Sequence, residues 1–213
     1  MGSMPSTMGL GLGSFVALWV LMVAAMMLPS VAPFAALYTR TFTNHWGVRL
    51  AAFAAGYLVV WSLAAVPAYW LAWIVDHLAS GHPAVATGLG VAIFAGCGIY
   101  QLSPLKQRCL IRCRSTLGLL LQYGSLRGRA RDLRAGLTHG AYCLACCWAL
   151  MAVLIALGFM NLVAMVVLTA IVLIEKTPRW GHRAGQAAGL AALLLGVLVL
   201  FQPGLAPGLH LGG

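Results

Sequence analysis

The chain has 213 residues, of which 62% are hydrophobic and only 8% are charged, and its formal net charge is +10. Soluble domains carry roughly a quarter charged residues, so this composition excludes an ordinary soluble domain and indicates an integral membrane protein. The net positive charge alone would fit a nucleic-acid-binding protein, but the positions of the basic residues argue against that function.

Six apolar stretches, most of them about 20 residues long, are candidates to cross a membrane. Their approximate bounds are residues 14–38, 50–75, 84–102, 137–157, 160–174 and 184–201. The apolar runs are continuous rather than alternating, which favours helices over a β-barrel. We therefore predict an all-α fold, a polytopic helical membrane bundle that forms a single domain over residues 1–213.

The Lys and Arg residues predict how these spans are oriented. All 13 fall in the first, third and fifth connections between spans, and most lie in the basic connection over residues 103–136. By the positive-inside rule these connections are cytoplasmic, so both termini lie outside, in a bacterial inner membrane. Four arginines of the third connection are expected to contact anionic lipid headgroups, namely Arg127, Arg129, Arg131 and Arg134. No Lys or Arg precedes Arg40, so a cleaved signal peptide is not expected.

The first span carries a group of methionines followed by two prolines. Met22 and Met26 share one helix face, and Met27 lies beside it. Pro29 and Pro33 each remove a backbone donor and should kink the helix. The methionines are either ordinary core filler or thioether ligands next to a site that the kink opens.

The third connection begins with a helix signal. Ser103 can cap the helix and Pro104 suits its first turn. Helical spacing then places Lys106, Cys109 and Cys113 on one face. These thiols lie on the reducing side of the membrane, so metal binding or simple packing is expected rather than a disulfide.

The fourth span carries the most distinctive pattern in the sequence. Its members are His139, Cys143, Cys146, Cys147 and Met151, which share one stripe of a helix. An imidazole, three thiols and a thioether are soft ligands that suit copper(I), zinc or an iron–sulfur cluster. Such groups in an apolar span are more than packing requires, and they predict a functional site.

The fifth span ends in an acid followed by a base. Glu175 and Lys176 are expected to pair with each other or to reach toward the membrane surface. Glu175 could instead pair with an arginine or with His139 of the neighbouring hairpin.

Five blocks of the sequence resemble the bacterial family called domain of unknown function 2182, whose members are described as predicted metal-binding integral membrane proteins. The blocks are Met22–Ser30, Gly98–Ser115, Thr138–Met151, Gly158–Met165 and Glu175–Lys176. The resemblance extends from the first span through the fifth and implies a polytopic helical bundle.

The resemblance also implies a set of metal ligands. The residues at the motif positions are Cys109, Cys113, His139, Cys143, Cys146, Cys147, Met26 and Met27. One departure is Ala145, where the family pattern has Gly before the paired cysteines. This change crowds the helix face slightly but removes no ligand.

The sequence therefore favours a membrane protein that binds copper(I), with zinc as the alternative metal, and that transfers, stores or chaperones the ion. A soluble or membrane protein that delivers the metal is the expected partner. The chain has no nucleotide-binding loop and no acid–base pair typical of a hydrolase, so an enzyme is not favoured. Two alternatives remain open, a membrane thiol redox protein and an accessory structural subunit of a membrane complex.

Overall fold

The computed structural model describes most of the chain. The described residues are 11–40, 46–79, 82–115, 118, 121–123, 130–159, 161–177 and 179–209. Two of the arginines expected to contact headgroups, Arg127 and Arg129, lie outside these ranges.

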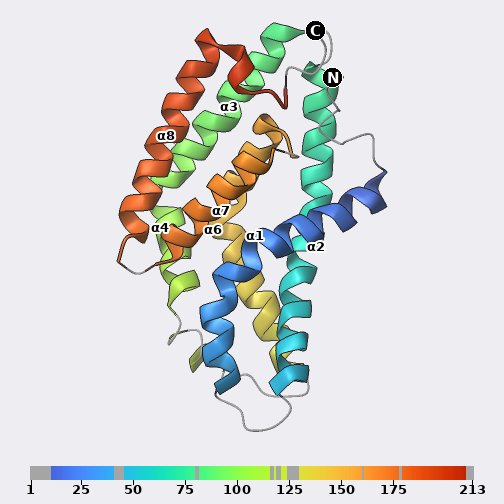
Figure 1. The fold of residues 1–213 in the computed structure, drawn as a ribbon, viewed down its shortest axis with the longest axis vertical. Coiled ribbons are helices and arrows are strands. Elements are labelled where there is room, and N and C mark those ends of the chain that lie inside the picture. Colours follow the sequence, from blue (N-terminus) through green and yellow to red (C-terminus); the bar gives the residue numbers. More distant parts are fainter. Residues whose placement is uncertain are drawn as a thin grey trace.

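Within the described ranges the chain is helical and contains no strand, so the all-α prediction is confirmed (Figure 1). The helices are α1 (Leu12–Arg40), α2 (Trp46–Ala79), α3 (Pro83–Leu102), α4 (Pro104–Arg114), α6 (Arg131–Leu157), α7 (Leu162–Lys176), α8 (Gly181–Phe201) and the 3-10 helix η1 (Pro203–Leu205).

Five of the six predicted spans correspond to helices that are long and apolar enough to cross a membrane. Among the described residues these helices are α1, α2, α3, α6 and α8. The predicted span over residues 160–174 corresponds to α7, which has only 15 residues. A helix of this length rises about 22 Å, short of the roughly 30 Å hydrocarbon core of a bilayer. The membrane span predicted over residues 160–174 and the orientation of the termini therefore stay predictions.

The helices form two closely packed pairs, α2 with α6 and α3 with α8. Figure 1 shows α3 and α8 side by side along one edge of the molecule, with α2 along the opposite edge. Glycines allow the backbones to approach each other, as is typical of helices that pack in membranes. A Cβ atom at Gly136 of α6 would collide with the carbonyl oxygen of Phe53 of α2. On the other pair, a Cβ atom at Gly98 of α3 would collide with Leu193 of α8.

Two local predictions are confirmed. The helix α1 contains Pro29 and Pro33, and Figure 1 shows that it bends partway along its length. The helix α4 begins as expected, with Pro104 in its first turn and the Ser103 hydroxyl accepting a hydrogen bond from the Lys106 backbone N–H at 3.2 Å. This cap fixes the start of α4 and therefore the face on which its cysteines lie.

The close approach of α2 and α6 can be tested with a single methyl group. We expect Gly136→Ala to lower the free energy of unfolding by about 1–3 kcal/mol, because the added methyl forces the two backbones apart. Thermal unfolding of the protein in detergent measures the change. The matched control is Gly96→Ala in α3, whose added Cβ would meet nothing within 4 Å. Equal melting temperatures for the two variants would contradict this account of the packing.

Candidate metal centre

The buried stripe of α6 has the composition predicted from the sequence. His139, Cys143, Cys146, Cys147 and Met151 all lie in the interior, and Cys143 has no exposed surface. The helix begins with residues of the third connection and then packs against α2, α4 and α3. The stripe is therefore surrounded by protein rather than by lipid.

The thiol of Cys143 is the point at which several helices meet. Its sulfur lies 3.1 Å from the Tyr57 hydroxyl of α2 and 3.2 Å from the Lys176 ammonium of α7. The same ammonium donates to the Ser30 hydroxyl of α1 at 2.6 Å. The thiolate is the form of cysteine that binds metals, and a neighbouring ammonium group is one of the features that favour it.

A further thiol reaches this point from α4. Cys113 is buried and interacts with the thiols of Cys143 and Cys146. The neighbouring thiols of Cys143 and Cys146, together with burial, raise the pKa of Cys113 well above its usual value. Cys113 therefore lies among the thiols of α6, whereas Cys143 also lies next to a cation.

The other two thiols of α6 have partners within their own helix. Cys146 and Cys147 donate to the backbone carbonyl of Cys143 at 3.1 and 2.8 Å respectively. Thiols bonded in this way are satisfied without a metal. To act as ligands they would first have to give up these bonds.

His139 lies one turn before Cys143 in an aromatic environment. Its ring stacks on Phe34 with the centroids 4.9 Å apart, and the rings of Phe53, Tyr57 and Tyr123 lie around it. Its Nδ1 atom is buried and has no hydrogen-bond partner among the described residues.

The remaining predicted ligands lie on α4 and α1. Cys109 is half-buried on α4. Met26 and Met27 are buried in α1. Within the described part of the chain, no group of three or more His, Cys, Asp or Glu side chains is arranged to hold a metal ion. The thiols of Cys113, Cys143 and Cys146 are thus neighbours, but they do not form a preassembled three-ligand site.

The prediction that Glu175 and Lys176, at the end of α7, pair with each other or reach toward the membrane surface is wrong. Glu175 binds the Lys106 ammonium of α4 through both carboxylate oxygens, at 2.7 and 2.8 Å, and both side chains are buried. Lys176 turns instead toward Ser30 and Cys143. Adjacent residues on a helix project about 100° apart, so these two side chains reach different neighbours.

The sequence does not predict that Ser30, Tyr57 and Lys176 belong to this site. Ser30 and Lys176 lie inside blocks that carry the family resemblance, which is the one signal in the sequence that points to them. Tyr57 lies in an apolar span with no pattern to distinguish it. Its importance is visible only from its contact with Cys143.

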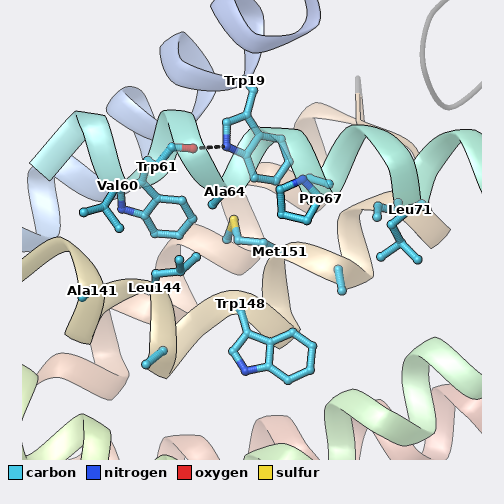
Figure 2. Close-up of a pocket in the computed structure, with 14 residues that line it drawn as sticks. Trp19, Val60, Trp61, Ala64, Pro67, Leu71, Ala141, Leu144, Trp148 and Met151 are labelled. Atoms are coloured by element: carbon cyan, nitrogen blue, oxygen red, sulfur yellow. Dashed lines mark hydrogen bonds between the residues drawn. The ribbon is translucent and has the colours of Figure 1, made fainter. Parts of the chain in front are cut away.

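A cavity of about 510 Å³ lies between α1, α2 and α6 (Figure 2). At its rim the Trp19 indole N–H donates to the Trp61 carbonyl at 3.1 Å, and Met151 extends from α6 beside Ala64 (Figure 2). The described residues that line the cavity are apolar and include no cysteine. This lining suits hydrocarbon rather than a metal ion, so the cavity and the thiols are separate features.

The comparisons with known proteins agree with a metal-handling role. A family model described as PpoB2, copper chaperone, matches residues 16–199. No curated protein and no solved structure matches the chain. The prediction that the chain belongs to a metal-related family is confirmed. Its membership of the family called domain of unknown function 2182 stays a prediction.

The different burial of the thiols predicts their reactivity. Cys109 is the half-buried cysteine, while the other five are buried. We expect a maleimide to label Cys109 rapidly in the detergent-solubilised protein and the others only after denaturation. Mass spectrometry of digested protein identifies the labelled thiol, and Cys109→Ser should abolish the rapid phase. Rapid labelling of Cys113 or Cys143 would contradict the packing described here.

Proposed function

We propose that this chain, which belongs to the PpoB2 copper chaperone family, binds copper(I) as its cargo between the thiols of Cys113 and Cys143. The observation that carries the proposal is the meeting of a thiol from α4 with the thiols of α6 in the interior of the bundle. Thiolates are soft ligands, and soft ligands select copper(I). Copper(I) accepts a low coordination number, so two thiolates can hold it without a preassembled three-ligand site.

Hydrogen bonding distinguishes Cys143 from the other thiols of α6. The Cys143 sulfur is approached by the Tyr57 hydroxyl and the Lys176 ammonium, both of which can stabilise a thiolate. Cys146 and Cys147 instead donate their protons to a carbonyl. We therefore assign Cys146 and Cys147 to ligand exchange as the ion leaves.

The charge of the complex also fits the surroundings. One copper(I) ion between two thiolates has a net charge of −1, and an isolated charge is costly to bury. Lys176 supplies the compensating positive charge in contact with Cys143. Lys176 thus makes the loaded site neutral overall.

The half-buried position of Cys109 suits first capture of the ion from a cytoplasmic donor protein. His139, Met26 and Met27 are proposed as secondary ligands along the path of the ion. We place the protein in the bacterial inner membrane, with the basic connections in the cytoplasm and in contact with anionic headgroups. Under this arrangement the protein receives copper on the cytoplasmic side and passes it to a membrane partner.

Removal of the proposed ligands tests the function. We expect Cys143→Ser and Cys113→Ser each to weaken copper(I) binding by at least about 100-fold, since loss of an outer-shell partner alone typically costs 10–100-fold. Competition with a chromogenic copper(I) chelator, in detergent and under reducing conditions, gives the affinity. Cys97→Ser, which changes another buried thiol on α3, is the control and should leave the affinity unchanged. Equal affinities for all four proteins would rule out the proposed ligands.

Substitutions that remove or keep the positive charge of Lys176 test its role in copper(I) binding. We expect Lys176→Met to weaken copper(I) binding roughly 10- to 100-fold, as for an outer-shell partner, because the loaded site then retains an uncompensated negative charge. Lys176→Arg keeps the charge and should retain more of the affinity than Lys176→Met. The same chelator competition measures both variants, and identical losses would show that charge is not what Lys176 contributes.

A thiol redox function is the second candidate, and the closeness of Cys113 to Cys143 favours it. The metal content of purified protein, measured by mass spectrometry, separates the two functions. Stoichiometric copper that is lost from the Cys143/Cys146/Cys147-to-Ser variant supports copper handling. If no metal is bound even after loading under reducing conditions, the copper proposal fails and redox chemistry or packing is left.

A further inference from the structure

A buried ion pair joins α4 to α7 and takes no part in the function proposed above. Lys106 and Glu175 are at most 2% exposed, and the ammonium lies 2.7 and 2.8 Å from the two carboxylate oxygens. The Gln101 side-chain amide of α3 donates to the same carboxylate at 2.9 Å. The carboxylate therefore ties α3, α4 and α7 together at one point.

The positions of the two partners along their helices relate this ion pair to the thiols. Lys106 and Cys113 are seven residues apart on α4, about two turns, and both belong to its buried face. Glu175 immediately precedes Lys176, which contacts Cys143. The ion pair thus holds the helix that carries Cys113 against the helix that supplies the cation beside Cys143.

The composition of α4 explains why an ion pair is needed to keep this helix in place against the other helices. The helix has only 11 residues, and three of its side chains are arginines, at positions 108, 112 and 114. Its buried side chains are Lys106, Leu110 and Cys113, so apolar burial is small. An intact buried ion pair sets a single register, because any displacement leaves a charge unpaired in the interior.

We propose that Lys106 and Glu175 are positioning residues that fix Cys113 against Cys143. The expected effect of the ion pair on copper binding rests on the function proposed above. Its expected effect on the placement of the two thiols is independent of that function. The ion pair sets the register of α4, and the register decides whether the two thiols meet.

The positioning is measured by the rate at which the two thiols form a disulfide. The other four cysteines are first replaced by Ser, leaving Cys113 and Cys143. Diamide then oxidises this pair, taking up the two thiol hydrogens as the S–S bond forms. The test variant is Lys106→Met/Glu175→Met, which removes both charges together, since replacing a buried ion pair by apolar side chains of similar volume is often tolerated.

We expect this double variant to form the disulfide at least about 10-fold more slowly, because a misplacement of 1 Å can cost two orders of magnitude in rate. Arg108→Met is the matched control, since it removes an exposed charge from the same helix and should leave the rate unchanged. The exchanged pair Lys106→Glu/Glu175→Lys keeps an ion pair and should recover most of the rate. A folded double variant with an unchanged rate would overturn the proposal, and so would an exchanged pair that folds yet stays as slow as the double variant.

The copper measurement then asks whether the ion pair acts through Cys113. With all cysteines present, the double variant should bind copper(I) as weakly as Cys113→Ser does, and adding Cys113→Ser to it should cause no further loss. An additive loss would show that the ion pair does not act through this thiol. If the unmodified protein binds no copper(I), the proposed function fails, and the disulfide rates still decide the positioning proposal.

Discussion

The constraint on which the structure depends is the pairing of its few buried carboxylates. An unpaired charge in an apolar bundle is costly, and removing one partner of a buried ion pair typically costs about 3–5 kcal/mol. Glu175 binds Lys106 of α4, while Asp132 of α6 binds Arg49 of α2 and the Tyr38 hydroxyl of α1. Each carboxylate therefore joins helices that are distant in the sequence, and together they determine how α1, α2, α4, α6 and α7 are arranged.

Lys176 differs from these paired cations in a way that bears on function. Its described contacts are with the Ser30 hydroxyl and the Cys143 sulfur rather than with a carboxylate. A cation in this position is matched most naturally by a thiolate, or by a thiolate complex of a metal ion. The distribution of charge in the bundle thus distinguishes Cys143 from the other thiols of α6, which donate to a backbone carbonyl.

Close backbone packing provides the rigid frame around this site. The α2–α6 contact has no room for a side chain at Gly136 of α6 or at Gly56 of α2. Helices in this contact have a defined separation and register, as is typical of small-residue interfaces. Tyr57 follows Gly56 directly, so the close contact also brings the Tyr57 hydroxyl to Cys143. Packing and site geometry are therefore determined by the same pair of helices.

The sequence by itself determined the helical fold, the positions of the long apolar helices and the stripe of soft ligands on α6. These features are local: they depend on composition and on spacing within one helix, as the Ser103 cap and the run from His139 to Met151 show. Only the tertiary structure decided that Cys113 meets Cys143 while Cys109 stays half-buried, that Glu175 pairs with Lys106 rather than Lys176, and that Tyr57 belongs to the site. These contacts join helices between 30 and 86 residues apart in the chain, and the spacing within one helix carries no information about which face of another helix it will meet.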